Sequence, residues 1–261
     1  MTKVRLDSAL AERGLFASRS AAAASVRAGR VRVGADGPVA VKPGQMVEPE
    51  ADLVVAEPPR FVSRGGIKLE NALERLGIAP AGRECLDVGS STGGFTDCLL
   101  QRGATRVASL DVGYGQLDAR LRADPRVIVM ERRNARELEP GDLPFAPALI
   151  TVDVSFISLA KLLAPLAACL AADGELLGMV KPQFELGPGR TGKGGVVRSA
   201  EDRREAVLDV VSAAKAAGLA VRGFASSGLP GPKGNRETFV WCAAGGDGLD
   251  DPAAALAEVA L

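Results

Sequence analysis

Four ionisable residues of this chain, two lysines and two carboxylic acids, could together activate a hydroxyl group: Lys68, Asp153, Lys181 and Glu237. The chain contains no histidine, so a general base must be another ionisable residue, and a lysine in a perturbed environment is the natural candidate. The lack of histidine also excludes a Ser-His-Asp triad and a histidine-ligated metal site. A Lys-Asp-Lys-Glu set suggests deprotonation of a sugar hydroxyl.

The two lysines have different sequence contexts. An isolated lysine has a pKa of about 10.4 and is a poor base near neutrality, but a second cation and partial desolvation both favour the neutral amine. We therefore expect Lys181 to be the base and Lys68 to support it. Asp153 and Glu237 would orient the two lysines. Taken singly, Lys68 and Glu237 are also typical of exposed positions, whereas Lys181 directly follows the apolar run 176–180.

Alternating strands and helices must position these residues. The pattern predicts strands at 84–88, 106–111, 126–130, 148–152 and 175–180, and helices at 66–76, 94–101, 116–122, 159–171 and 201–217. This order implies a parallel sheet. The last two predicted strands, 220–225 and 238–243, lack an intervening helix and should pair as an antiparallel hairpin. The expected fold is α/β, a Rossmann-like class I methyltransferase sheet that is mostly parallel.

A glycine-rich segment joins the first predicted strand of this sheet to its helix. Glycine lets the backbone turn sharply and approach a nucleoside closely at the carboxyl end of the sheet, although a tight turn needs glycine for its geometry alone. The spacing G-x-x-x-G-G differs from the dinucleotide pattern G-x-G-x-x-G, which argues against NAD. The candidate cofactor residues here are Asp87, Gly89, Ser90, Ser91, Thr92, Gly93, Gly94 and Phe95.

Three further polar residues follow later strands. Asp111 ends the second strand, where a carboxylate can accept hydrogen bonds from the ribose hydroxyls of an adenosine cofactor, including NAD. Asn134 follows the third strand and could contact the adenine edge or cap the next turn. Asp153 ends the fourth strand, where a carboxylate can offset the positive charge of a sulfonium. The cofactor that this set implies is S-adenosylmethionine.

The first 60 residues differ from the rest in charge and in pattern. Residues 1–34 contain seven basic and two acidic side chains, although the whole chain has a formal net charge of zero. Such local positive charge is typical of a surface that faces phosphates. Short helices, the second capped by Ser18 or Ser20, precede a hairpin-rich stretch that ends at Pro58 and Pro59. We expect a small α+β domain at 1–59, a linker at 60–66 and a catalytic domain at 67–261.

Other classes of protein have little support. The cysteines are scattered and form no C-x-x-C pair, so no metal site is expected. The longest apolar run, 162–172, contains a proline and is shorter than the roughly 20 residues that span a bilayer. The N-terminus lacks the apolar core of a signal peptide. We expect a cytoplasmic protein that uses neither a metal nor a membrane. The basic loop 187–195 could close over RNA or be a surface turn.

Several motifs together resemble the TlyA family of hemolysin-like ribosomal RNA 2'-O-methyltransferases. They are Ser63-Arg64-Gly65 and the segments 87–97, 153–158 and 181–185, and the resemblance covers nearly the whole chain. It implies an FtsJ-like catalytic domain whose Lys-Asp-Lys-Glu tetrad falls on the four residues named first. It also implies S-adenosylmethionine-dependent 2'-O-methylation of cytidine in large-subunit ribosomal RNA, and in some members also in the small subunit.

The same resemblance implies that residues 1–59 are an alpha-L RNA-binding domain of the type found in a small-subunit ribosomal protein. Its partner would be ribosomal RNA or a ribosomal subunit, with these candidate RNA-binding residues: Arg5, Arg19, Arg27, Arg30 and Arg64. Family members often have Asn before Gly in the N-terminal hairpin, where this chain has Val33 before Gly34. The alternatives are a catalytically inactive RNA-binding protein, a membrane-active hemolysin and, more distantly, a nicotinamide-dependent oxidoreductase.

Overall fold

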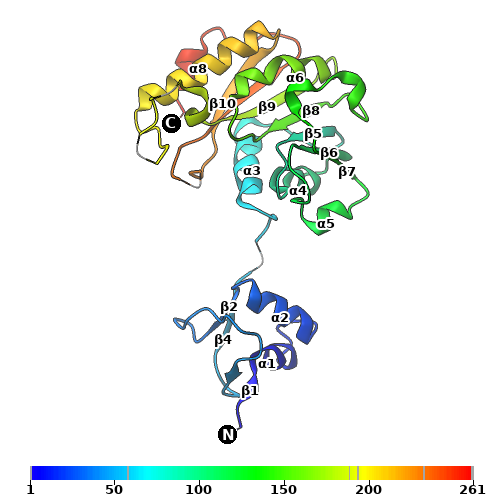
Figure 1. Cartoon of the computed structure of the whole chain (residues 1–261), viewed down its shortest axis with the longest axis vertical. Coiled ribbons are helices and arrows are strands. Elements are labelled where there is room, and N and C mark those ends of the chain that lie inside the picture. The colour runs from blue at the N-terminus through cyan, green and yellow to red at the C-terminus, as the bar shows by residue number, and fades with distance from the viewer. Residues whose placement is uncertain (1, 58, 188, 193, 232, 260–261) are drawn as a thin grey trace. The chain divides into compact units, whose positions relative to one another are not determined.

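A computed structural model of the chain (Figure 1) contains two compact units, Met1–Arg60 and Phe61–Leu261. It describes residues 2–57, 59–187, 189–192, 194–231 and 233–259. Pro58, expected to end the first domain, lies outside the described residues, as do Pro188 and Lys193 of the basic loop. Each unit has a hydrophobic core of its own.

The N-terminal unit packs short helices against short antiparallel strand pairs. Its elements are β1 (Val4–Arg5), α1 (Leu6–Glu12), α2 (Arg19–Arg27), β2 (Val31–Val33), β3 (Met46–Val47) and β4 (Leu53–Val55). β1 pairs with β3, and β2 pairs with β4. Ser18 caps α2, because its Oγ accepts a hydrogen bond from the Ala21 N–H at 3.1 Å. Leu6, Leu10 and Val26 are buried where the helices meet.

A seven-stranded sheet forms the centre of the second unit as far as the structure describes it. Its strands are β5 (Glu84–Val88), β6 (Arg106–Asp111), β7 (Val127–Glu131), β8 (Leu149–Val152), β9 (Glu175–Val180), β10 (Ala220–Ser226) and β11 (Thr238–Ala243). The spatial order is β10-β11-β9-β8-β5-β6-β7. The first five strands in sequence are parallel, and β11 is antiparallel to both of its neighbours. The predicted fold class is therefore confirmed, and β11 is inserted between β9 and β10.

Helices cover both faces of this sheet (Figure 1). One core is shared with α3 (Arg64–Leu76), α4 (Gly94–Gln101) and α5 (Ala119–Arg122). The other is shared with α6 (Leu163–Cys169), α8 (Ala200–Ala216) and α9 (Pro252–Ala257). Shorter elements connect these: η1 (Ala135–Glu137), η2 (Pro140–Asp142), η3 (Leu159–Lys161) and α7 (Pro182–Glu185).

Two helices differ from the sequence prediction. The predicted helix 159–171 is divided into η3 and α6, because Pro165 has no N–H to donate to the carbonyl of Lys161, the last residue of η3. The helix predicted from residue 116 begins at Ala119, where the Asp118 side chain caps it by accepting a hydrogen bond from the Arg120 N–H.

Candidate active site

The strand ends bring three of the four predicted ionisable residues to one edge of the sheet. Asp153 directly follows β8, and Lys181 directly follows β9. Because β11 runs antiparallel to β9 and Thr238 pairs with Val180, Glu237 lies beside the end of β9. The fourth residue, Lys68, comes from the second turn of α3 and reaches the same region.

The four residues form two ion pairs. The Lys68 ammonium group pairs with the Glu237 carboxylate. The Lys181 Nζ lies 2.5 Å from Asp153 Oδ1 and donates a hydrogen bond to Ser155 Oγ at 3.1 Å. Both lysines are 8% exposed and Glu237 is 3% exposed. Buried charges of this kind are costly without a partner, so each lysine depends on its own carboxylate.

The glycine loop packs directly on these elements. Gly89 has φ +82°, and a Cβ there would lie 2.4 Å from the Asp153 carbonyl oxygen. A Cβ on Gly94 would lie 2.2 Å from Ser63 Oγ, at the start of α3. Only glycine allows these approaches, so the loop lies against the residue that pairs with Lys181 and against the helix that carries Lys68.

Asp87 lies beneath this loop. Its Oδ2 accepts a hydrogen bond from Thr96 Oγ1 at 2.6 Å, and Thr96 Oγ1 is 2.7 Å from Ser109 Oγ. Complete burial raises the pKa of Asp87 to about 7, although the hydrogen bond from Thr96 opposes this. Asp87 is not among the described residues that line the cavities of the site. The structure thus places the Asp87 side chain beneath the loop, where it supports the loop from below.

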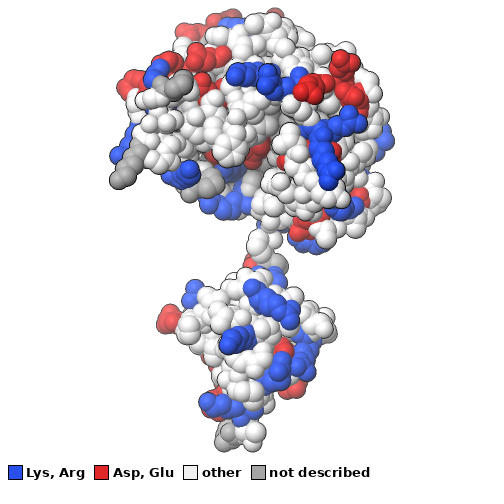
Figure 2. All heavy atoms as spheres, viewed as in Figure 1, with Lys and Arg blue, Asp and Glu red and all other residues white. Residues whose placement is uncertain are grey.

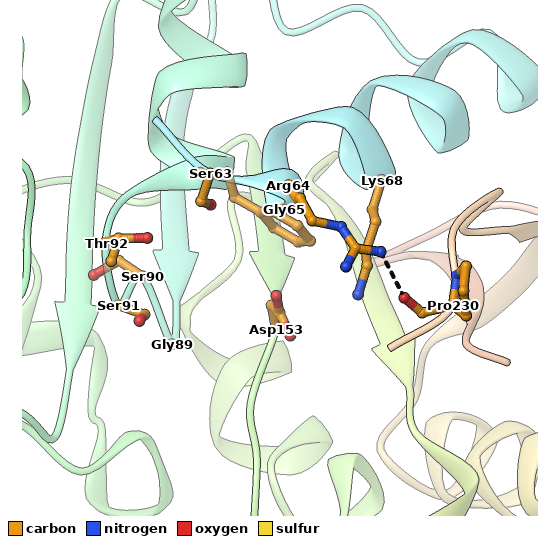
Figure 3. A pocket seen from close by; sticks show the side chains of 12 residues that line it. Ser63, Arg64, Gly65, Lys68, Gly89, Ser90, Ser91, Thr92, Asp153 and Pro230 are labelled. Atoms are coloured by element: carbon orange, nitrogen blue, oxygen red, sulfur yellow. Dashed lines mark hydrogen bonds between the residues drawn. The ribbon is translucent and has the colours of Figure 1, made fainter. Parts of the chain in front are cut away.

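Three cavities surround the ion pairs and share lining residues. The first lies between the loop and α3, where Ser63, Arg64, Lys68 and Asp153 face it (Figure 3). The second has a volume of about 550 Å³, and its lining includes Gly89, Ser91, Asp111, Asn134, Asp153 and Phe156. The third is lined by residues that include Ser155, Phe156, Lys181 and Glu237. Asp153 lines the first two cavities, whereas Ser155 and Phe156 line the second and third.

Asp111 and Asn134 line the second cavity while also holding local backbone. Asp111 accepts hydrogen bonds from the Ser91 N–H at 2.8 Å and the Gly113 N–H at 2.7 Å. A carboxylate has about four acceptor sites, so Asp111 keeps capacity for hydroxyl donors. Asn134 caps η1 by accepting a hydrogen bond from the Arg136 N–H at 3.1 Å. Asn134 therefore caps the next turn, which is one of the two alternatives from the sequence, and it also lines the second cavity.

The candidate RNA-binding arginines have different environments. Arg5 and Arg19 are exposed and both pair with Asp7, which is buried. Arg27 is exposed and Arg30 is half-buried. Figure 2 shows Lys and Arg side chains distributed over the visible face of the N-terminal unit. Arg64 instead belongs to α3 and lines the first cavity, where it donates a hydrogen bond to the Pro230 carbonyl at 3.0 Å (Figure 3).

Several cavity residues were missed as site residues, above all Phe156. Its side chain is 92% exposed, its φ is +67°, and its ring centroid lies 5.4 Å from that of Phe184. A non-glycine residue in this backbone region is uncommon and is found most often at functional sites. The sequence did contain a signal for this site, because an aromatic residue lies shortly after Asp153 and another shortly after Lys181.

The described residues contain neither a cluster of metal ligands nor a membrane-spanning helix. Within those residues, His, Cys, Asp and Glu side chains form no group of three or more that could hold a metal ion. No helix in the described part of the chain has the length and apolar character needed to cross a membrane.

Comparison with known proteins adds a family. The model of the FtsJ-like methyltransferase family matches residues 61–244. A 16S/23S rRNA (cytidine-2'-O)-methyltransferase TlyA of Mycobacterium tuberculosis is 49% identical over 241 residues, 92% of this chain and 89% of that protein. A putative rRNA methyltransferase YqxC of Bacillus subtilis is 40% identical over 96% of this chain and 90% of its own. The structure of a putative hemolysin from Streptococcus thermophilus has a TM-score of 0.74 and 37% identity, and covers 99% of this chain and 96% of that one.

Proposed function

We propose that this chain, which belongs to the FtsJ-like methyltransferase family and to its TlyA group, methylates the ribose 2'-hydroxyl of cytidine in ribosomal RNA. The methyl donor would be S-adenosylmethionine. The observation that carries the proposal is two ion pairs, Lys68 with Glu237 and Lys181 with Asp153, beside a glycine loop at the carboxyl ends of parallel strands. Both lysines and Glu237 are buried, and Asp153 is half-buried. Ligands of open α/β sheets bind at this edge.

The residues around the second cavity fit this donor. Its volume of about 550 Å³ lies within the range of small-molecule sites. Asp111 would hold the ribose hydroxyls and Asn134 the adenine edge, while the close approach at Gly89 holds the loop against Asp153. Asp153 would face the sulfonium. When bound, S-adenosylmethionine supplies an electrophilic methyl group on a positively charged sulfur.

The protein's own residues would align the hydroxyl and remove its proton. We assign Lys181 Nζ as the proton acceptor, because it lies beside both Asp153 and the third cavity. Asp153 lines the donor cavity as well, so the same carboxylate would face the donor and hold Lys181 in place. Lys68, held by Glu237, lines the first cavity and would support Lys181 in aligning the hydroxyl.

The N-terminal unit would supply RNA affinity. Arg5, Arg19 and Arg27 are exposed, and arginine binds phosphate oxygens bidentately. Arg30 is less exposed, and Arg64 lies at the first cavity, where it would contact RNA close to the reacting nucleotide. The sequence-predicted domain at 1–59 is accordingly proposed to be the RNA-binding domain. Since ribosomal subunits assemble in the cytoplasm, the protein would work there.

The proposal is tested by incubating purified protein with methyl-labelled S-adenosylmethionine and ribosomal subunits that lack this modification. Nucleoside mass spectrometry should detect 2'-O-methylcytidine. Small and large subunits are assayed separately, because the name of the Mycobacterium tuberculosis relative includes both 16S and 23S rRNA. The assay thus shows which subunits this protein modifies. Label on a base, or on no nucleoside in either subunit, would contradict the proposed function.

A further inference from the structure

Two short segments carry the Lys181–Asp153 ion pair. Residues 153–158 follow β8 and begin with Asp153, while residues 181–185 follow β9 and begin with Lys181. The second segment is mostly the four-residue helix α7, and the first leads into the three-residue helix η3. Helices this short have little stability of their own, so contacts between the segments must fix their positions.

Glu185, the last residue of α7, makes the contacts at the far end of these segments. Its Oε2 accepts a hydrogen bond from Ser158 Oγ at 2.5 Å, and its Oε1 accepts one from the Leu159 N–H at 2.8 Å. Ser158 is the N-cap residue of η3, and its own side chain makes no capping hydrogen bond. A carboxylate from α7 therefore supplies the cap that η3 needs.

Contacts join the two segments at three places along their length. Lys181 contacts Asp153 and Ser155 at one end. The rings of Phe184 and Phe156 meet in the middle, with centroids 5.4 Å apart. The hydrogen bonds of Glu185 close the other end, which prevents the segments from sliding past each other.

We propose that Glu185 is a positioning residue that sets the distance between Lys181 Nζ and Asp153 Oδ1. Glu185 does not contact either group, and it acts through the segments that carry them. Its kinetic role rests on the proposed function, whereas its geometric role can be tested without it. Displacement of a reacting group by about 1 Å can lower a rate by about 10²-fold.

The test compares Glu185→Ala with Glu185→Gln. Glu185→Ala should lower the single-turnover rate of methyl transfer per folded molecule by about 10²-fold, with S-adenosylmethionine affinity little changed. Glu185→Gln should restore most of the rate, because the glutamine carbonyl can still accept from the Leu159 N–H and its amide can pair with the Ser158 hydroxyl. In crystal structures of both proteins, the Nζ–Oδ1 distance should be longer in Glu185→Ala than in the wild type.

Asp251→Ala is the matched control. Its carboxylate caps α9 by accepting from the N–H groups of Ala253 and Ala254, each at 3.0 Å, so the variant also loses a cap within the same unit. It should lower the melting temperature and leave the rate unchanged. An unchanged Nζ–Oδ1 distance in Glu185→Ala, or a Glu185→Gln rate as low as that of Glu185→Ala, would overturn the positioning role. A wild-type protein that makes no 2'-O-methylcytidine would instead contradict the proposed function, and the crystal structure would still decide the geometry.

Discussion

Two arginines in the N-terminal unit, Arg5 and Arg19, share one carboxylate, that of Asp7, and their side chains are 46% and 57% exposed. Two lysines in the catalytic unit, Lys68 and Lys181, each have a carboxylate of their own. Their side chains alone are 10% and 9% exposed. The arginine set therefore keeps uncompensated positive charge in water. The lysine set is balanced and mostly removed from water.

The two sets of charges suit different tasks. The exposed arginines suit attraction of phosphates, whereas the buried lysines suit a reaction. Exposed charge acts on phosphates over a distance, tolerates small changes in geometry and is screened by salt. Buried charge is sensitive to its partner, because the loss of one member leaves the other unpaired. The aspartates Asp7 and Asp87 are both buried, but only Asp7 is paired with arginines. Arg5 and then Arg19 hold the pKa of Asp7 at about 2, whereas burial without a cation raises that of Asp87 to about 7.

The lysine set should show the largest effect of a single substitution. Lys181→Met keeps the length of the side chain and removes the ammonium group, and we expect methyl transfer to fall by about 10²–10⁴-fold, the usual contribution of a general base. Binding of S-adenosylmethionine, measured by calorimetry, should change little. Single-turnover transfer measures the rate, and Lys68→Met is the comparison, with a smaller loss. Wild-type turnover in Lys181→Met would show that the base is another group.

The two aspartates should respond to pH in opposite directions. The pKa of Asp87 rises from 3.8 to about 7, so its contribution to stability is complete below about pH 4 and is lost as the pH rises to about 7. The loss is roughly 4 kcal/mol at about 1.4 kcal/mol per pKa unit. Urea unfolding should show the stability of the wild type, relative to Asp87→Asn, falling over this range.

Asp7→Asn gives the opposite comparison. Since the pKa of Asp7 is lowered from 3.8 to about 2, its contribution is present above about pH 4 and is lost as the pH falls towards 2. For the Asp87 prediction, the contrary result would be stability curves of the wild type and Asp87→Asn that run parallel between pH 4 and 7. That result would show that the Asp87 carboxylate does not titrate in this range.

A smaller effect is expected from the loop on which the lysine set depends. Gly89→Ala would place a Cβ 2.4 Å from the Asp153 carbonyl oxygen, and we expect S-adenosylmethionine to bind about tenfold more weakly, a loss of about 1.4 kcal/mol. Gly82→Ala is the control, because Gly82 also has a positive φ, +76°, but no atom lies within 4 Å of the added Cβ. Equal affinity losses in both variants would attribute the effect to backbone strain instead of the close approach.

The smallest effect should come from one exposed arginine. Under the proposed RNA-binding role, Arg19→Ala would remove a phosphate contact, so RNA affinity should fall moderately and the slope of log affinity against log salt should decrease by about 0.7. Arg13→Ala is the control within the same unit, because the Arg13 guanidinium donates to the carbonyl of Ala51 at 2.7 Å. A slope that is unchanged in Arg19→Ala would remove Arg19 from the phosphate contacts.

The sheet could be predicted because its signal is local and repeated. Apolar runs alternate with helical segments, and this order alone implies parallel strands. The hairpin of β10 and β11 was local as well. The insertion of β11 beside β9 was not, since the choice of a second neighbour depends on which edge of the assembled sheet is free.

The residues of the candidate site also differ in whether a local sequence pattern predicts them. Asp111, Asp153 and Lys181 directly follow apolar runs, so the rule for strand ends was enough to select them. Lys68 and Glu237 lie 169 positions apart, and each alone is typical of a surface residue. Their burial follows from pairing with each other, which no local pattern contains. Asp87 was predicted to be a cofactor residue because it precedes the glycine turn, but the sequence does not show how deeply its side chain is buried.

The position of β11 also affects when the protein can become active during its synthesis. Glu237 directly precedes the penultimate element of the described chain, so a ribosome that has added Lys68 must add 169 more residues, the last of them Glu237, before the counter-ion is present. At typical rates of synthesis this takes on the order of 10 to 30 seconds. Throughout that time the emerging chain has only part of its charge set, and a truncated product that lacks β11 should be inactive even if it folds. The charge set is therefore complete only after synthesis has passed Glu237 and reached the last strand of the sheet.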